Sequence, residues 1–306
     1  MKQIIIITSS LIIAALAIST YYYYRSDPLL PPFPSNNTGE VNNETQEGTA
    51  SEPLTPVYVS ERIVYSLDND GLNISFNSGT DWVTVPVEKD DLFSGEYTGN
   101  KQELIENSFI LTEERALFLY TEGKGVHIVY SLNQGSTWQD AVVTEQFPPM
   151  RFRKVAFLND EFGYVILSGD RTMSQEWSTV FLTNDGGMTW QETNHSGVTR
   201  LIYDGGFIDE TTGFLSYGGV NPEEPDFYVT HDAGNKWSKA NFRIPDKYDK
   251  IFVTAEIPFQ EGDALAVLLN QGPSGDYMGG EVKGKFISKD HGLTWEFSME
   301  VNPDEQ

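Results

Sequence analysis

One eight-residue pattern, [ST]-x-[DN]-x-G-x-x-W, recurs five times along the chain. Its tryptophans are separated by 56, 52, 47 and 58 residues. Recurrence at intervals near fifty residues is typical of a protein built from one structural unit repeated along the chain. We therefore predict a repeat architecture, and we call the five segments boxes 1 to 5. They are residues 75–82, 131–138, 183–190, 230–237 and 288–295.

The residue types inside each box favour a structural role in a turn over a catalytic role. Asparagine or aspartate at the third position can accept hydrogen bonds from turn amides two residues on. Glycine at the fifth position allows a positive φ, and the tryptophan can fold back over the hairpin as an apolar plug. Two boxes carry asparagine, which cannot act as an acid, a base or a strong cation ligand. The third and eighth positions are Asn77 and Trp82, Asn133 and Trp138, Asp185 and Trp190, Asp232 and Trp237, and Asp290 and Trp295.

The segments around and between the boxes predict β-strands. Each box is flanked by β-branched and aromatic runs, and segments such as 155–167 and 206–216 read as strand, tight turn, strand. Four strands per repeat make one propeller blade. The boxes resemble the Asp-box, or BNR, repeat of sialidase-like β-propellers, over residues 57–302. We therefore predict an all-β, five-bladed propeller of four-stranded blades over residues 57–306, with no helix beyond about two turns and a short or missing innermost strand in blade 1.

The first 56 residues have a different character. Residues 4–19 are almost wholly apolar and four tyrosines, Tyr21 to Tyr24, follow them, which is typical of a membrane-spanning helix with an interfacial aromatic belt. We predict a signal anchor over residues 1–25, a flexible linker rich in Pro, Asn, Thr and Glu over residues 26–56, and a propeller on the extracellular side. The alternative is a signal peptide cleaved at Ala15–Ala17, which would release a secreted protein.

Composition excludes several classes of function. The chain has 45 acidic and 20 basic residues, for a net charge of −25, so we expect no nucleic-acid partner. It has no cysteine, which excludes thiolate metal sites and cysteine catalysis. Its four histidines show no metal-ligand spacing, so we expect neither a metal nor another cofactor.

A set of arginines marks the predicted ligand-binding surface. The box lies between the third and fourth strands, so the connections between blades lie on the opposite face of the propeller. Arg153, Arg200 and Arg243 precede or open three successive blades there, with Arg171 and Trp177 alongside. Convergent guanidinium groups could bind a carboxylate bidentately. The alternative is that each arginine pairs with a nearby acid of its own chain, for example Asp170, Asp204 or Asp246.

The resemblance leaves two functions open. Propellers similar to photosystem assembly factors and sortilin-type receptors use such boxes without catalysis, which implies a non-catalytic binding or assembly module for a protein, peptide or glycan. The alternative is a sialidase-like glycoside hydrolase, which needs an arginine trio, a Tyr–Glu nucleophile pair and an aspartic acid. Residues 242–245, Phe-Arg-Ile-Pro, match a sialidase motif, although in that family the motif precedes the boxes. Tyr203, Tyr248 or Tyr277 could supply the nucleophile. We expect no catalytic residues.

Overall fold

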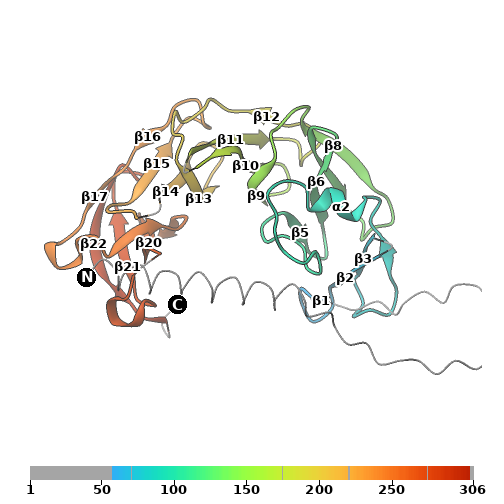
Figure 1. The fold of residues 1–306 in the computed structure, drawn as a ribbon, viewed down its shortest axis with the longest axis horizontal. Coiled ribbons are helices and arrows are strands. Elements are labelled where there is room, and N and C mark those ends of the chain that lie inside the picture. The colour runs from blue at the N-terminus through green and yellow to red at the C-terminus, as the bar shows by residue number, and fades with distance from the viewer. Residues whose placement is uncertain (1–56, 70, 174, 220, 274, 304–306) are drawn as a thin grey trace, which may run out of the picture. The chain divides into compact units, whose positions relative to one another are not determined.

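The computed structural model describes residues 57–303 apart from 70, 174, 220 and 274 (Figure 1). These residues belong to one compact unit of the chain. The predicted membrane anchor and linker, residues 1–56, lie outside the described residues. Within the described part, no helix is long and apolar enough to cross a bilayer.

Four of the five sheets have four antiparallel strands in sequence order. Sheet 1 is β1 (Val57–Tyr58), β2 (Val64–Asp68), β3 (Gly71–Ser75) and β4 (Val83–Thr84); sheet 2 is β5 (Phe109–Leu111), β6 (Ala116–Glu122), β7 (Gly125–Ser131) and β8 (Gln139–Thr144). Sheet 3 is β9 (Met150–Phe157), β10 (Gly163–Thr172), β11 (Gln175–Thr183) and β12 (Gln191–Glu192); sheet 4 is β13 (Leu201–Phe207), β14 (Gly213–Gly218), β15 (Asp226–Thr230) and β16 (Ser238–Lys239). This arrangement confirms the four-stranded unit, and β1 is short, as expected.

Sheet 5 departs from the predicted four strands. Its path is β17-β22-β21-β20-β18, and β19 also pairs with β20. These strands are β17 (Asn241–Arg243), β18 (Phe252–Ala255), β19 (Phe259–Glu261), β20 (Ala264–Gln271), β21 (Lys283–Ser288) and β22 (Thr294–Val301). Strand β17, which follows sheet 4 in the chain, pairs in parallel with β22, the last strand of sheet 5. It therefore lies at the outer edge of sheet 5 and not beside the inner strand β18.

Helical structure in the described residues is limited to three short segments. They are α2 (Lys89–Leu92), η1 (Asp246–Tyr248) and η2 (Tyr277–Gly279), of three or four residues each. For the described residues, this confirms the expectation of no helix longer than about two turns.

The core consists of four apolar clusters, each between two consecutive sheets. One cluster joins sheets 1 and 2, and the others join sheets 2 and 3, 3 and 4, and 4 and 5. Because the middle sheets are covered on both faces, β14 and the first seven residues of β10 are continuously buried instead of alternating. Among the described residues no cluster joins sheet 5 to sheet 1, so the number of blades in a closed ring stays a prediction.

The five boxes share one hydrogen-bond pattern, and each lies between the third and fourth strand of the four-stranded path. The Ser or Thr hydroxyl at the first position donates to the Asn or Asp Oδ1 at 2.8–2.9 Å. The same hydroxyl accepts the glycine N–H at 2.8–3.0 Å. The Oδ1 atom also accepts the amide of the seventh position at 2.8–2.9 Å.

This pattern corrects one detail of the expected turn. The amide that the Asn or Asp side chain binds lies four residues on, not two, so the side chain closes the whole loop. Each box glycine has φ between 78° and 99°, which explains why glycine is required there.

Trp190 and Trp295 fold back over their own boxes, as expected, whereas Trp237 Nε1 donates to the Asn194 carbonyl outside its box at 3.2 Å. Trp190 Nε1 donates to the Gly187 carbonyl at 3.1 Å, and Trp295 Nε1 donates to the Gly292 carbonyl at 3.0 Å. Trp295 is fully buried and stacks on Phe242 of β17 with 5.9 Å between ring centroids. The indole therefore links its turn to the neighbouring structure.

Candidate functional site

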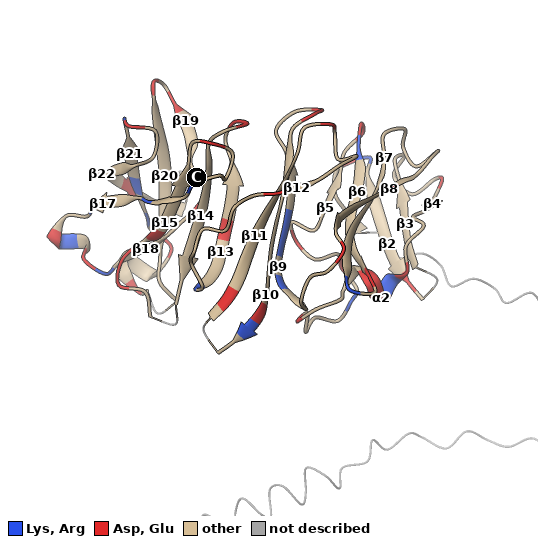
Figure 2. Cartoon of the chain, turned by 90° about the horizontal axis from the view of Figure 1, so that it is seen from above, with Lys and Arg blue, Asp and Glu red and all other residues tan. Residues whose placement is uncertain are grey.

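The end of sheets 3 and 4 that lies opposite the boxes contains most of the predicted arginines. Figure 2 shows a basic stretch along β9, in a chain whose loops are rich in acidic residues. Arg151, at the start of β9, donates through Nε and Nη2 to the Glu176 carboxylate at 2.5 Å each, and Glu176 also accepts the Ile202 N–H at 2.7 Å. Glu176 is buried. This bidentate ion pair fixes β9, β11 and β13 to one another.

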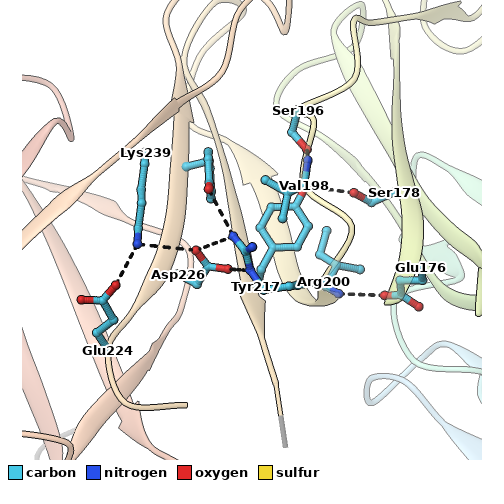
Figure 3. Close-up of polar contacts among 11 residues, drawn as sticks. Glu176, Ser178, Ser196, Val198, Arg200, Tyr217, Glu224, Asp226 and Lys239 are labelled. Atoms are coloured by element: carbon cyan, nitrogen blue, oxygen red, sulfur yellow. Dashed lines mark hydrogen bonds and ion pairs between the residues drawn. The ribbon is translucent and has the colours of Figure 1, made fainter. Parts of the chain in front are cut away.

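Arg200 forms a second ion pair, at the start of sheet 4 (Figure 3). Its Nε and Nη2 donate to the two oxygens of Asp226, with 2.9 Å between Nη2 and Oδ1, and Nη2 also contacts the Tyr228 hydroxyl at 3.2 Å. The hydrogen bond to Asp226 raises the pKa of Arg200. Lys239 Nζ lies 4.0 Å from Asp226 and 2.8 Å from Glu224. The side chains form one chain of alternating charge.

Arg153 is buried and is used inside the fold. It is 4% exposed, and its guanidinium donates to the carbonyl oxygens of Leu92, at 3.1 Å, and of Ser94. Burial lowers its pKa to about 10. Its role is to hold the loop between sheets 1 and 2 against β9.

The position of Arg243 corrects the predicted arrangement. It lies on β17, on the outer edge of sheet 5, and its Nη1 donates to Glu296 of β22 at 2.6 Å. Arg153 and Arg200 lie instead on or just before the first strands of sheets 3 and 4. The sequence prediction placed the three arginines at equivalent positions near the axis, and it was wrong because β17 pairs with the outermost strand.

Trp177 and Arg171 lie near the hairpin between β10 and β11. Trp177 is 48% exposed and packs nearly perpendicular to His195, with 5.6 Å between ring centroids. Arg171 Nε donates to the Met173 carbonyl at 3.1 Å, and its Nη1 lies 3.7 Å from Glu96. The Tyr217 hydroxyl contacts the hydroxyl of Ser178, the residue after Trp177, at 2.9 Å and that of Ser196 at 2.8 Å. The structure thus brings an exposed indole and an imidazole together beside the Arg200 network.

Two of the candidate tyrosines meet at one carboxylate in sheet 5. Glu300 accepts hydrogen bonds from Tyr248, from Tyr277 at 2.9 Å and from Lys247 at 3.1 Å. The Tyr248 hydrogen bond is the main cause that lowers the pKa of Glu300 to about 2, and the same carboxylate raises the pKa of Tyr277. A phenol that donates to a carboxylate is held in its neutral form, which is a poor nucleophile. The third candidate, Tyr203, lies on β13 and donates to the Gly219 carbonyl at 3.2 Å.

Within the described residues, no group of three or more His, Asp or Glu side chains is placed to hold a metal ion. Sequence reasoning missed Glu176, Asp226, Glu296 and Glu300 as partners. The one feature of the sequence that bears on these partners is the excess of acidic over basic residues. It predicts that each arginine has an acidic partner, but it does not identify the partner.

Comparisons with known proteins identify the family. Among solved structures, the chain is similar to a GH43_1 enzyme from Xanthomonas citri (12% identity over 63% of this chain and 72% of that chain, TM-score 0.34) and to an endo-arabinase from Bacteroides thetaiotaomicron (12%, 64% and 81%, TM-score 0.36). A protein of unknown function from Dyadobacter fermentans gives 12% identity, coverages of 63% and 70%, and a TM-score of 0.40.

Likenesses at this level say nothing about the activity of the chain. No curated protein matches it. Residues 19–268, however, match the sequence profile of the DUF6242 β-propeller domain. The match covers most of the chain, so the chain belongs to the DUF6242 β-propeller domain family.

Proposed function

We propose that this chain is a non-catalytic binding module, held outside the cell by its N-terminal segment. In this proposal the recognition surface is the end of sheets 3 and 4 that exposes Trp177, and the ligand is a glycan. The apolar run of residues 4–19 and the four tyrosines after it support the location.

The observation that carries the proposal is that the arginines are separately engaged. Arg200 and Arg243 each bind a carboxylate of their own sheet, and Arg153 is buried against two carbonyl oxygens. A sialidase-type site needs several guanidinium groups free and convergent on one substrate carboxylate. Here each guanidinium already has acceptors, and these lie on different elements.

Trp177 is the side chain that best fits a role in binding. Large aromatic side chains are usually buried, and one that stays half exposed at a polar surface often serves recognition. A sugar ring has an apolar face of C–H groups that can stack on an indole, and a rim of hydroxyls that needs donors and acceptors. His195, which packs against Trp177, can supply a donor or an acceptor.

A pair of aromatic truncations tests the proposal. The purified chain, Trp177→Ala and Phe259→Ala would be compared on an array of cell-surface oligosaccharides. Phe259 is a matched control because it is 44% exposed and lies on β19 of sheet 5. We expect Trp177→Ala to lose at least tenfold in affinity for the bound oligosaccharides and Phe259→Ala to keep it. Equal binding by Trp177→Ala and wild type would contradict the proposal.

A second candidate, the sialidase-like hydrolase, rests on the Tyr–Glu contacts of sheet 5, in which Glu300 would have to act as the base that takes the proton of a tyrosine nucleophile. Glu300 contacts Tyr248, which is buried, and Tyr277, which is partly exposed. The test is release of 4-methylumbelliferone from its sialoside by the wild type and by Tyr277→Phe. Turnover that disappears in Tyr277→Phe would support the hydrolase and would overturn the non-catalytic proposal.

A further inference from the structure

A large cavity lies at the box end of sheets 2 and 3, away from the Trp177 surface. Its volume is about 1040 Å³, at the upper end of the range for ligand pockets. Strand β11 runs from Gln175, at the Trp177 end, to Thr183, at the box end. Eight steps of about 3.3 Å separate the two ends by roughly 26 Å. The cavity is therefore a separate surface.

Apolar side chains are exposed around this cavity at positions where the boxes need none. Leu132 is the second residue of box 2 and is 55% exposed, and Met188 is the sixth residue of box 3 and is 59% exposed. The hydrogen-bond pattern that the five boxes share uses no side chain at position two or position six. Leu158, after β9, adds a third exposed apolar side chain to the cavity wall. These three apolar side chains are therefore exposed without a role in packing the fold.

The charge around the cavity is negative. Glu114, Asp160, Glu161 and Asp185 line it, together with one basic residue, Arg115. The Arg115 guanidinium stacks 3.9 Å from the centroid of Phe157 and donates to the Asp160 carbonyl at 3.0 Å.

Two of these carboxylates, those of Glu114 and Glu161, have no cationic partner among the described residues, whereas Asp160 lies near Arg115 and interacts with it electrostatically. No ion pair in the described part of the chain involves Glu114 or Glu161. This differs from the opposite end, where Glu176 and Asp226 are paired with arginines. Unpaired carboxylates beside exposed apolar side chains attract a ligand that is both cationic and apolar.

We propose that this cavity binds a basic peptide segment with apolar side chains at its centre, presented by a partner protein. The apolar side chains enter the cavity between Leu132, Leu158 and Met188, and the flanking lysines or arginines reach the carboxylates at its rim. A second copy of this chain is the wrong partner, because each copy has a net charge of −25.

The test measures peptide binding to the full chain by fluorescence anisotropy. The probe is labelled Lys-Lys-Leu-Phe-Leu-Lys-Lys, and its controls are Lys-Lys-Ser-Gly-Ser-Lys-Lys, which has only the charge, and Glu-Glu-Leu-Phe-Leu-Glu-Glu, which reverses it. We expect the probe to bind at least tenfold more tightly than either control. If the serine–glycine peptide binds as tightly as the probe, net charge alone accounts for the binding, and the proposal is overturned.

Matched variants locate the binding. Leu132→Ser with Met188→Ser should weaken probe binding at least tenfold, whereas Leu293→Ser should not. Leu293 is the sixth residue of box 5 and is 41% exposed, so it controls for loss of an apolar residue from a box. Wild-type affinity in the double variant, or equal loss in Leu293→Ser, would contradict the proposal.

Two further comparisons complete the test. The double variant Glu114→Gln, Glu161→Gln should weaken probe binding severalfold. Glu145→Gln, which removes an exposed acid outside the cavity, should leave probe binding unchanged.

Dimerisation of the wild-type chain without peptide, if it is lost in the double variant Leu132→Ser, Met188→Ser, would assign the cavity to a second copy instead. Trp177→Ala should bind the probe like the wild type, which separates this proposal from the function proposed above.

Discussion

Replacement of Asp185 in box 3 tests whether the boxes are structural. In wild type, Asp185 Oδ1 accepts the Thr189 N–H at 2.9 Å and the Thr183 hydroxyl at 2.8 Å, and Oδ2 accepts the Thr189 hydroxyl at 2.6 Å. Box 2 is a natural version with asparagine at this position. There Asn133 keeps both Oδ1 contacts and donates through Nδ2 to Thr137 at 2.8 Å. We expect Asp185→Asn to reproduce this geometry.

The expected magnitudes follow from the contacts that each variant loses. Asp185→Asn keeps both Oδ1 hydrogen bonds and reverses the third, so it should cost less than about 0.5 kcal/mol. Asp185→Ala loses all three and should cost about 1–2 kcal/mol, the range found for lost helix caps. In a domain of this size, 1 kcal/mol corresponds to about 2–4 °C in Tm. The alanine variant should therefore melt about 2–8 °C below wild type, and the asparagine variant within about 2 °C of it.

The pH dependence gives an independent check. Hydrogen bonds, first that from the Thr189 hydroxyl, lower the pKa of Asp185 to about 2, below the usual value near 3.9. A lowered pKa means that the carboxylate stabilises the fold above about pH 3.9, and that this contribution is lost as the pH falls toward 2. Asparagine has no such dependence. The stability difference between wild type and Asp185→Asn should therefore change in favour of the variant between pH 4 and pH 2.

The assay is urea and thermal unfolding followed by tryptophan fluorescence, to which Trp190 of the same box contributes. Wild type and the two variants are measured at pH 7 and again at several values down to pH 2. Equal destabilisation by asparagine and alanine at pH 7 would refute the reasoning, because it would mean that the negative charge, and not the acceptor geometry, is what the box requires.

Four other substitutions, compared in two pairs, follow from the same structure. Glu176→Gln should lower the free energy of unfolding by about 3 kcal/mol, because it leaves the partly buried guanidinium of Arg151 without its counterion. Arg243→Ala breaks an exposed ion pair and should change the free energy of unfolding by about 1 kcal/mol or less. Urea melts measure both variants, and equal losses would contradict the distinction between the buried and the exposed pair. Gly292→Ala should destabilise far more than Gly123→Ala in thermal melts, since both glycines have positive φ but the added Cβ would lie 2.5 Å from Phe214 Cε1 in the first and in open space in the second. Similar melting temperatures for the two glycine variants would show that only backbone strain matters.

The repeated unit could be predicted because its signals are local. Each box fixes a turn through side chains within eight residues, and the strands on either side follow from β-branched and aromatic runs. The pairing of β17 could not be predicted, because residues 241–243 carry no feature that separates an inner strand from an outer one. The parallel pairing with β22 is set by packing, in which Phe242 stacks on Trp295.

The candidate site was less predictable than the fold for a related reason. The sequence shows which residues carry charge, but the partner of each arginine lies 25, 26 or 53 residues away, as for Arg151 with Glu176, Arg200 with Asp226, and Arg243 with Glu296. Acids closer in sequence, such as Asp204 and Asp246, were the expected partners. Asp204 instead pairs with Lys154, at 2.6 Å. Sheet register, not sequence distance, decides which charges meet.

The excess of acids then determines where a ligand can bind. With more than two acids per base, most arginines on the folded surface have a carboxylate within reach, and their affinity for an external anion is reduced by that internal competitor. Acids without a basic partner are left over, and two of them, Glu114 and Glu161, line one cavity beside the exposed side chain of Leu132. A strongly acidic propeller should therefore recognise cations more readily than anions. An anion that binds Arg200 or Arg243 must first displace the carboxylate of Asp226 or of Glu296.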